Sequence, residues 1–572
     1  MENIKLIKED TDHLIKWISK HVGKLEEEDI SIILIVKEYF IENDTHEISY
    51  DLFNKLHTKS KQKKLGITYT PEVIRRKLTR NVLNYFHPED VRGLTICDPC
   101  CGTGLFTLTL LEELENFDID IKTALTKNVF LYDLDKLSVA ISLLNLYLFC
   151  KKRKIEIFDM MLNCEVKNFF ENDTKFDAFI TNPPYVKLQN LDKGDIEKFK
   201  IDFSKIFHGA PGLALLFSYK LLKDLKKNGI LGIITQNNFF TSLAASKYRS
   251  EIRGYLNKIE TFGNDLKFDG VNAYTCLLYL TEKENTNFLY LKNTDSPIES
   301  HYSTINTSEL NNKKWRLGSR KQLQNLKILE TKGVRLGDTS KIWVGIATQL
   351  DKAFLCEERD NIWYGKTKEG TFVQIDKEVV KKLIKISNFS NEKELQDNKI
   401  GIIFPYKQTI SGKFELFEGV YFEKSFPKTY SYLESWREEL LNRQKGNIAE
   451  SEWYKWGRVQ SMHSVEKKLL TKTFDTKPNF KYDQSDSLFS NGYALKPNEE
   501  FFDINFLKQI LNSDIFYNYM KLTSFEIAGD YQCYQKNFIE NFCIPKINLK
   551  LQKELVENDE VNRFISDYYQ LT

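Results

Sequence analysis

Short apolar runs alternate with longer segments of helical spacing between about residue 66 and residue 282. Apolar runs bounded by turn residues are typical of buried strands, and segments of about 10 to 15 residues between them are typical of helices. The predicted strands are 94–97, 129–132, 155–158, 178–181, 230–235 and 274–280, and the predicted helices are 105–116, 137–150, 213–226 and 243–256. This pattern predicts an α/β fold with a doubly wound, mostly parallel sheet, whose ligands bind beyond the carboxyl ends of the strands.

The pattern changes on both sides of this region. Residues 1–65 are helical in spacing and rather charged, with an apolar stretch from Ile30 to Val36, and they end in a basic run from Lys59 to Lys64. That run is interpreted as a solvated linker, with a phosphate-contacting arm as the alternative. Residues 291–572 are less regular, with strand-like pieces at 343–347, 401–405 and 468–474. We therefore expect a helical N-terminal extension (1–65), an α/β domain (66–290) and a mixed α/β C-terminal domain (291–572).

Composition narrows the class of protein. The chain has 572 residues, of which 41% are hydrophobic and 28% charged, which excludes disorder as the main state. Its 82 basic and 80 acidic residues give a net charge of +2, which excludes a uniformly basic surface but not one basic groove. No apolar run reaches the ~18 residues that span a bilayer, and the N-terminus has no signal-peptide pattern. Of the nine cysteines, three cluster at Cys97, Cys100 and Cys101 and six are scattered, without a second group at metal-ligand spacing, which favours a reducing, cytoplasmic compartment and no metal site.

The first chemical motif is Asp98-Pro-Cys100-Cys-Gly102-Thr-Gly104, which lies between a predicted strand and a predicted helix. Glycines at such a turn allow the backbone to approach a ligand closely. The spacing matches neither G-x-G-x-x-G nor the phosphate-binding G-x₄-G-K-[ST], so a pyrophosphate site is not expected. An acid at the start of the loop instead suits a ligand that carries cationic groups. The alternative is a plain tight turn.

Two further acids follow predicted strands. Asp133 ends the strand 129–132, and an acid at the end of the second strand of such a fold commonly accepts hydrogen bonds from ribose hydroxyls. Asp135 is interpreted as a helix N-cap. Asp159 follows the predicted strand 155–158 and is a candidate acceptor for an adenine amino group. For Asp159, a capping or solvated carboxylate is an equally good interpretation.

The sharpest motif is Asn182-Pro183-Pro184-Tyr185, directly after the predicted strand 178–181. Two prolines fix the backbone and remove two N–H donors, so the turn is stiff and leaves its carbonyls and the Asn182 side chain available. A purely structural loop has little need for this combination at the mouth of a sheet.

Together these motifs resemble the S-adenosylmethionine-dependent adenine-N6 DNA methyltransferases, specifically the TaqI-like type with gamma motif order and a C-terminal target-recognition domain. The resemblance runs from about Gly66 to Pro545 and includes Thr70-Pro71, upstream of the glycine loop. Weaker matches to the recognition domain lie at 343–354, 453–458 and Tyr531-Gln532-Cys533-Tyr534. The resemblance implies a class I, Rossmann-like methyltransferase fold with S-adenosyl-L-methionine as cofactor and double-stranded DNA as substrate.

The resemblance also implies roles for single residues. The implied cofactor-binding residues are Thr70, Pro71, Asp98, Cys100, Gly102, Gly104, Asp133, Asp159 and Asn182. The implied catalytic residues are Asn182, Pro183, Pro184, Tyr185 and, from a separate match at 268–275, Phe268. Asn182 Oδ1 and the Pro183 carbonyl would accept hydrogen bonds from the N6 amine of an adenine flipped out of the duplex, while Tyr185 and Phe268 stack on the base. No nucleophilic cysteine is needed for this reaction.

The expected function is therefore a site-specific DNA adenine-N6 methyltransferase, either solitary or the modification enzyme of a restriction–modification system. We expect a monomer whose partners are DNA and, in the second case, a separate cognate restriction endonuclease, since no convincing nuclease motif is present. Basic groups at Arg75-Arg76-Lys77, 151–154 and 313–314 are candidate DNA contacts or solvated surface. Two alternatives stay open. The same turn serves RNA and protein-glutamine methyltransferases, and a binding subunit could retain a vestigial cofactor pocket.

Overall fold

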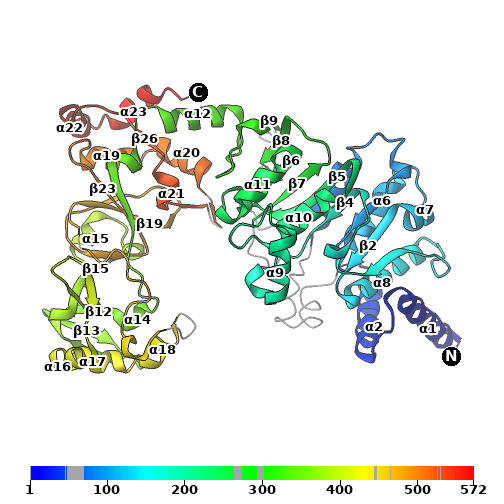
Figure 1. The fold of residues 1–572 in the computed structure, drawn as a ribbon, viewed down its shortest axis with the longest axis horizontal. Helices are drawn as coiled ribbons and strands as arrows, with labels where there is room; N and C mark the ends of the chain where they lie inside the picture. The colour runs from blue at the N-terminus through cyan, green and yellow to red at the C-terminus, as the bar shows by residue number, and fades with distance from the viewer. Residues whose placement is uncertain are drawn as a thin grey trace. The chain divides into compact units, whose positions relative to one another are not determined.

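The computed structural model describes residues 2–45, 47, 70–262, 274–292, 302–443, 448–463, 465–524, 526–527 and 530–571. The chain divides into two compact units, Met1–Arg320 and Lys321–Thr572 (Figure 1). The predicted stacking residue Phe268 lies outside the described residues.

The N-terminal unit is built on one large sheet. In the part of the chain that the structure describes, its strand order is β3-β2-β1-β4-β5-β7-β6-β8-β9. The strands from β3 to β5 are parallel, and β7 runs antiparallel between β5 and β6. The strands are β1 (Ile96–Asp98), β2 (Val129–Asp133), β3 (Asn163–Val166), β4 (Phe176–Thr181), β5 (Leu225–Gln236), β6 (Leu256–Thr261), β7 (Thr275–Thr281), β8 (Asn287–Lys292) and β9 (Ser303–Asn306).

Helices cover both faces of this sheet. One face packs against α1 (Glu2–Val22), α2 (Glu27–Glu42), α5 (Glu72–Leu83), α6 (Leu105–Glu115), the short α7 (Ile121–Thr123) and α8 (Lys136–Lys152). The other face packs against α10 (Leu213–Lys223) and α11 (Ser246–Ile252). Helix α9 (Lys193–Asp202) buries none of its residues. The α/β prediction, with a doubly wound and mostly parallel sheet and a helical N-terminal extension, is confirmed.

The central strand β5 explains why the sequence folds this way. Alternate residues point to opposite faces of a strand, so Ile230 and Ile234 enter the core with α5, α6 and α8, whereas Leu231 and Ile233 enter the core with α10. A strand buried on both faces requires such a continuous apolar run. Gly232 lets α5 approach closely, because a Cβ there would lie 2.4 Å from a methyl carbon of Val82.

Two predicted elements differ in the structure. Residues 155–158 form no strand, and the third strand is β3 at Asn163–Val166. The apolar pattern at 155–158 has another cause, because the Phe158 ring stacks 4.5 Å from His13 and contacts Trp17, both on α1. The predicted helix 243–256 is a short α-helix, α11, between two 3₁₀ turns, and the next strand already begins at Leu256.

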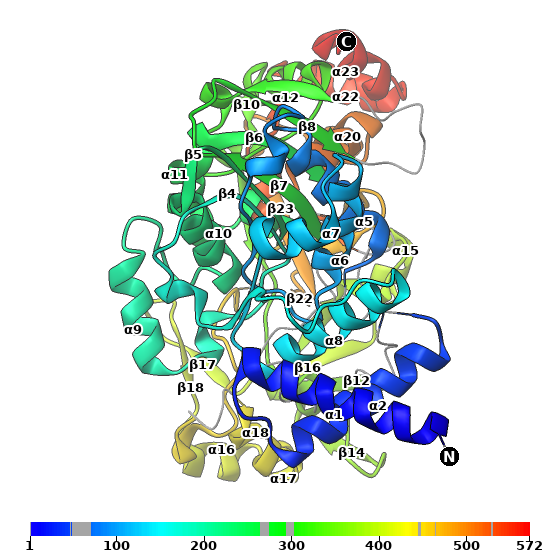
Figure 2. The same ribbon diagram turned by 90° about the vertical axis from the view of Figure 1, so that its right-hand side faces the viewer.

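The N-terminal extension is part of the core of its unit. Helices α1 and α2 both pack on α8 (Figure 2). Trp17, Ile33 and Phe40 are at most 4% exposed and belong to the same core as the buried residues of α8.

The C-terminal unit is a mixture of small sheets and helices. Among the described residues, its largest sheets have the orders β14-β13-β12-β16-β15-β22 and β11-β23-β19-β21, and smaller ones are β20-β25-β24, β10-β26 and β17-β18. The strands are β10 (Val334–Arg335), β11 (Ser340–Val344), β12 (Leu355–Arg359), β13 (Ile362–Lys366), β14 (Phe372–Ile375), β15 (Val380–Lys385), β16 (Ile400–Ile403), β17 (Tyr406–Gln408), β18 (Phe414–Leu416), β19 (Lys468–Lys472), β20 (Phe474–Asp475), β21 (Lys481–Asp483), β22 (Leu488–Ser490), β23 (Gly492–Pro497), β24 (Glu526–Ile527), β25 (Tyr531–Cys533) and β26 (Cys543–Ile544).

The helices of this unit contribute to two apolar cores. They are α13 (Leu336–Thr339), α14 (Asp351–Phe354), α15 (Glu392–Gln396), α16 (Gly419–Ser425), α17 (Pro427–Glu434), α18 (Arg437–Leu441), α19 (Ile504–Leu511), α20 (Asp514–Thr523), α21 (Lys536–Ile539), α22 (Leu549–Glu557) and α23 (Val561–Tyr569), while α12 (Arg320–Thr331) crosses the unit boundary. Two apolar clusters form the main cores, one around β12, β16 and Trp456 and one around α19, α20 and β19. The predicted mixed α/β character is thus present.

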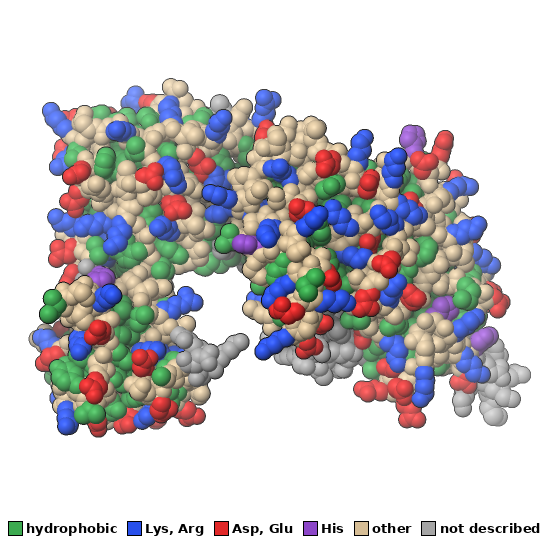
Figure 3. All heavy atoms as spheres, in the orientation of Figure 1, with side chains coloured by type: hydrophobic (Ala, Val, Ile, Leu, Met, Phe, Trp, Pro, Cys, Tyr) green, Lys and Arg blue, Asp and Glu red, His purple; other side chains and the backbone are tan. Residues whose placement is uncertain are grey.

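The surface carries charged side chains of both signs, in keeping with the nearly balanced charge of the sequence. On the face drawn in Figure 3, Lys and Arg side chains are interspersed with Asp and Glu. None of the helices that the structure describes has the length and apolar character that crossing a membrane requires.

Candidate functional site

Three neighbouring strands bring the predicted polar residues to one edge of the sheet. Strand β1 pairs in parallel with β2 on one side and with β4 on the other. Asp133, Asp98 and Asn182 stand at or directly after the carboxyl ends of these strands. The edge is therefore the one at which doubly wound sheets bind ligands.

The loop after β1 is a tight turn that ends in α6. Gly102 and Gly104 have φ angles of +52° and +82°, values that favour glycine. A Cβ on Gly104 would lie 2.3 Å from Ser142 Oγ, so this glycine also permits the close approach of α8. From the same helix, Asn145 Nδ2 donates to the carbonyl of Thr103 at 2.8 Å. Helix α8 thus forms the rigid wall behind the loop.

Asp98 is a buried carboxylate with unused hydrogen-bonding capacity. Its Oδ1 accepts hydrogen bonds from the Cys100 N–H at 3.2 Å and the Thr181 hydroxyl at 2.9 Å. Its Oδ2 is buried and has no hydrogen-bond partner among the described residues. Burial, helped by the nearby Asp133 and opposed by the two hydrogen bonds, raises the pKa of Asp98 to about 7. An orphaned carboxylate oxygen of this kind suits a ligand with cationic groups.

Asp133 organises the loop and keeps acceptor sites for a ligand. Its Oδ2 accepts from the Gly102 N–H and its Oδ1 from the Asp135 N–H, both at 2.9 Å. An ionised carboxylate has about four lone-pair sites, so two remain for a pair of hydroxyls. Burial raises the pKa of Asp133 to about 6. Asp135 caps α8 by accepting from the Ser138 N–H at 3.1 Å, as predicted.

In the double-proline corner after β4, both the nitrogen and the oxygen of the Asn182 side-chain amide form hydrogen bonds. Asn182 Nδ2 donates to Thr70 Oγ1 at 2.9 Å, and the Tyr185 hydroxyl donates to Asn182 Oδ1 at 2.7 Å. Pro183 is buried, whereas Pro184 and Tyr185 are only half-buried. Burial raises the pKa of Tyr185 well above its usual value, so its hydroxyl remains a proton donor.

A buried arginine anchors Thr70. Arg75, on α5, is 4% exposed and donates to the Thr70 carbonyl. It also donates to Thr109 Oγ1 at 3.3 Å and forms an ion pair with Glu47 at 3.0 Å. Pro71, the other predicted residue of this segment, is the N-cap residue of α5. Arg75 is therefore a structural residue of the site, and the sequence interpretation of Arg75 as a DNA contact or solvated surface is wrong.

Asp159 does not stand at the end of a strand. It lies exposed in a turn before β3, because the predicted strand 155–158 does not form. The residue that follows the carboxyl end of β3 is instead Lys167, which donates its N–H to the Asp133 carbonyl at 2.9 Å. Asn168 comes next, and its side chain caps a 3₁₀ turn by accepting from the Phe170 N–H at 3.2 Å. The strict polar–apolar alternation of residues 163–166 was the signal that identifies this half-exposed strand.

The cysteines of the loop are not reactive groups. Burial raises the pKa values of Cys100 and Cys101 well above the ordinary thiol value. Thiols kept protonated in this way pack as small apolar side chains.

Comparison with known proteins places this geometry in context. Residues 127–268 match the Eco57I restriction–modification methylase family. The Type II restriction enzyme and methyltransferase RM.Eco57I of Escherichia coli is 26% identical over 380 residues, which cover 59% of this chain and 37% of the relative. The Type II methyltransferase M.VspI of a Vibrio species is 29% identical over 203 residues, covering 35% of this chain and 44% of the relative. The chain thus spans less than half the length of these two relatives.

Two further comparisons cover more of the chain. The Type II methyltransferase M.BstVI of Geobacillus stearothermophilus is 22% identical over 453 residues, covering 70% of this chain and 74% of the relative. Among solved structures, the Type IIL restriction–modification enzyme MmeI, determined in complex with DNA, matches with a TM-score of 0.62 and 15% identity. That match covers 88% of this chain and 72% of the MmeI chain, and it supports the fold.

Proposed function

We propose that this chain, of which residues 127–268 match the Eco57I restriction–modification methylase family, transfers a methyl group to the N6 amine of an adenine flipped out of duplex DNA at a specific sequence. The observation that carries the proposal is the Asn182-Pro-Pro-Tyr185 corner. It stands beside Asp98 and Asp133 at the ligand-binding edge of the sheet, with the Asn182 amide held by Thr70.

The cofactor of this family is S-adenosyl-L-methionine, as the sequence predicts. The residues present fit it. The orphaned Oδ2 of Asp98 suits its cationic methionine end, and the two remaining acceptor sites of Asp133 suit its ribose diol. Asp159, exposed in the turn before β3, stays our candidate for the adenine contact. When bound, the cofactor supplies the electrophilic methyl group.

The residues of the Asn182–Tyr185 corner would act on the N6 amine of the target adenine. An exocyclic amine is a poor nucleophile because its lone pair is delocalised into the ring. Two oxygen acceptors, Asn182 Oδ1 and the Pro183 carbonyl, would draw its hydrogens out of the ring plane and stabilise the positive charge that develops on nitrogen. Since the Tyr185 hydroxyl occupies Asn182 Oδ1 at 2.7 Å, binding of the base replaces that hydrogen bond. The rings of Tyr185 and Phe268 would then stack on the base, at about 1–3 kcal/mol each.

The C-terminal unit would recognise the target sequence, and the protein would work as a monomer in the cytoplasm with a separate cognate endonuclease or alone. M.BstVI, which matches this chain over most of its own length, is named as a methyltransferase.

The decisive experiment compares the parental protein with Asn182→Ala. Methyl transfer from radiolabelled S-adenosyl-L-methionine to duplex DNA is measured, and the product is identified by mass spectrometry of the nucleosides. We expect N6-methyladenine from the parental protein. From Asn182→Ala we expect a protein that retains cofactor and DNA binding but does not transfer the methyl group. Methylated RNA or methylated glutamine in place of methylated DNA would overturn the choice of substrate. Transfer at the parental rate by Asn182→Ala would overturn the role of the corner.

A further inference from the structure

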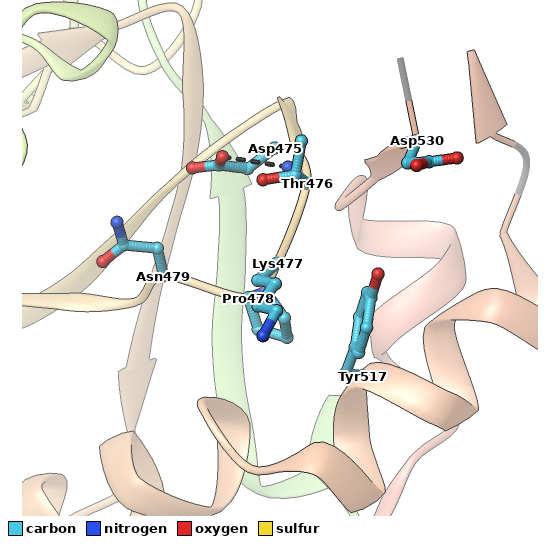
Figure 4. Close-up of a pocket in the computed structure, with 7 residues that line it drawn as sticks. All are labelled: Asp475, Thr476, Lys477, Pro478, Asn479, Tyr517 and Asp530. Carbon is cyan, nitrogen blue, oxygen red and sulfur yellow. Dashed lines mark hydrogen bonds between the residues drawn. The ribbon is translucent and has the colours of Figure 1, made fainter. Parts of the chain in front are cut away.

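The C-terminal unit has a polar cavity of about 430 Å³, outside the site described above. Figure 4 shows the loop from Asp475 to Asn479 on one side of it and Tyr517 and Asp530 on the other. Asp475 forms an ion pair with Lys472 at 3.6 Å, and Asp530 is exposed to solvent. Neither carboxylate resembles Asp98 of the N-terminal unit, which is buried with one oxygen unsatisfied.

The carboxylate of Asp98 is held by a residue from the neighbouring strand. Asp98 is the last residue of β1 and Thr181 is the last residue of β4, and these two strands pair in parallel. The Thr181 hydroxyl donates to Asp98 Oδ1 at 2.9 Å, across 83 positions of sequence. Thr181 is 0% exposed and directly precedes Asn182. The end of β4 therefore carries both a partner of Asp98 and the asparagine of the double-proline corner.

The two oxygens of Asp98 have different partners. Both of its hydrogen bonds, from the Thr181 hydroxyl and from the Cys100 N–H at 3.2 Å, end on Oδ1. Within the described part of the chain, the buried Oδ2 accepts none. Two donors from different segments fix the orientation of the carboxylate, so Oδ2 is left for a donor that the protein itself does not supply.

The same hydrogen bond favours the ionised form of Asp98. Burial raises the pKa of Asp98 to about 7, the Thr181 hydroxyl is the stronger of the two donors that oppose this rise, and the charge of Asp133 adds to it. Three thiols also face the carboxyl, and burial raises their pKa values well above the ordinary thiol value, so they stay neutral: Cys97, Cys100 and Cys101. Loss of the Thr181 hydroxyl would therefore raise the pKa of Asp98 further.

We propose that Thr181 is a positioning residue for cofactor binding, whose hydroxyl holds the Asp98 carboxylate ionised and leaves Oδ2 for the cationic methionine end of S-adenosyl-L-methionine. The inference rests on the proposed function for the placement of that end at Asp98. Thr181 itself touches neither the methyl group nor the base in this assignment, and it acts through Asp98.

The test uses Thr181→Val, which removes the donor and keeps the β-branched shape that strands prefer. Asp98 Oδ1 still accepts from the Cys100 N–H in this variant. Thr181→Ser keeps the hydroxyl. The matched control is Thr235→Val on the adjacent strand β5, because Thr235 is also 0% exposed and its hydroxyl has no hydrogen-bond partner among the described residues.

The measurement is the dissociation constant of S-adenosyl-L-methionine with the full-length chain, by calorimetry between pH 6 and pH 9 without DNA. Titration of the cofactor itself is common to all the proteins and cancels in the ratio of variant to parental constants. For Thr181→Val we expect this ratio to be roughly 10- to 100-fold below pH 7, as for loss of a hydrogen bond to a charged group. The ratio should become smaller as the pH rises to 9, because Asp98 then ionises in both proteins. Thr181→Ser and Thr235→Val should follow the parental profile.

Two outcomes would overturn the proposal. One is a parental profile for Thr181→Val. The other is a ratio that is the same at every pH, because a general loosening of the site weakens binding without moving the titration of Asp98. If Thr181→Val does not fold, Thr181→Cys carries the test, since its thiol is a weak donor. Its constants should then lie between those of the parental protein and those expected for complete loss of the donor.

The design separates this inference from the proposed function. If the ratio changes with pH as expected, the role of Thr181 stands even where no methyl transfer to DNA is found. If the parental protein methylates DNA but the profile of Thr181→Val is parental, only the role of Thr181 fails.

Discussion

Thr70 Oγ1 accepts a hydrogen bond from Asn182 Nδ2 at 2.9 Å, although 112 positions separate the two residues in sequence. This bond fixes which end of the Asn182 amide faces Thr70 and leaves the oxygen on the side of Tyr185. Thr70 is 5% exposed and is itself held by Arg75. The Asn182 amide is therefore oriented by the segment that precedes α5 and not only by its own turn.

The first prediction follows from that bond. Thr70→Val removes the acceptor while keeping the shape of the side chain, so Asn182 is free to rotate. We expect the rate of methyl transfer at saturating substrates to fall on the order of 10- to 100-fold, since an error of about 1 Å in positioning can cost about a hundredfold. Thr70→Ser keeps the hydroxyl and should restore the rate. Equal rates for the valine and serine variants would contradict the positioning role.

Tyr185 gives the second prediction. Tyr185→Phe removes the hydrogen bond to Asn182 but keeps the ring, so we expect methyl transfer close to the parental rate. Tyr185→Ala removes the stacking surface and should reduce kcat/KM for DNA by roughly 5- to 150-fold, equivalent to ~1–3 kcal/mol. Steady-state kinetics on one duplex substrate measures both. A phenylalanine variant as impaired as the alanine variant would show that the hydroxyl, and not the ring, is needed.

The third prediction concerns the glycine loop. Gly104→Ala places a Cβ 2.3 Å from Ser142 Oγ at a φ of +82°, whereas Gly102→Ala meets nothing within 4 Å at a φ of +52°. The alanine at 102 should cost about 1–2 kcal/mol of unfolding free energy from the left-handed backbone alone. The alanine at 104 should cost more, because of the added overlap. Thermal or urea denaturation measures the difference, and equal losses would argue against close packing of α8 on the loop.

Cofactor binding should depend on pH through Asp98. Burial raises the pKa of Asp98 to about 7 in the free protein. At pH 6 the carboxyl is mostly protonated, and a cationic ligand must displace that proton. The dissociation constant for S-adenosyl-L-methionine should therefore rise by about tenfold for each pH unit below the pKa.

Asp98→Asn is the control for this titration. It should bind more weakly at pH 8 and lose the dependence between pH 6 and pH 7, as measured by calorimetry at several pH values. A pH profile that is the same in both proteins would remove Asp98 as its source. The folded protein holds the Asp98 proton more tightly than the unfolded chain. The unfolding free energy without cofactor should therefore fall as the pH rises from about 4 to about 7. Asp133, whose pKa burial raises to about 6, contributes a decrease of its own between about pH 4 and pH 6, so the asparagine variant should keep that part and lose the decrease between about pH 6 and pH 7.

Much of the site follows from local sequence. Asp98, Asp133 and Asn182 were predicted at strand ends because β1, β2 and β4 are buried and their apolar runs end where a polar residue begins. Parallel order then brings such ends together without further information.

The sequence predictions that the structure contradicts share one cause: each depends on a contact between residues that are distant in sequence. The apolar residues at 155–158 are covered by α1, and nothing local distinguishes that from burial in a sheet. Arg75 reads as a surface cation in the sequence Arg-Arg-Lys, yet it is buried among Thr70, Thr109 and Glu47. The cavity of the C-terminal unit joins a loop, a helix and a turn that lie up to 55 positions apart (from Asp475 to Asp530), and no motif spans that distance.

Helix α8 has one side against the glycine loop and another beneath the N-terminal helix pair. A shortened protein that begins at residue 66 would expose the apolar side of α8 to water. Helix α8 would then pack less firmly against the glycine loop. The first two helices therefore support the glycine loop from behind through α8, and a shortened form of this protein should retain them.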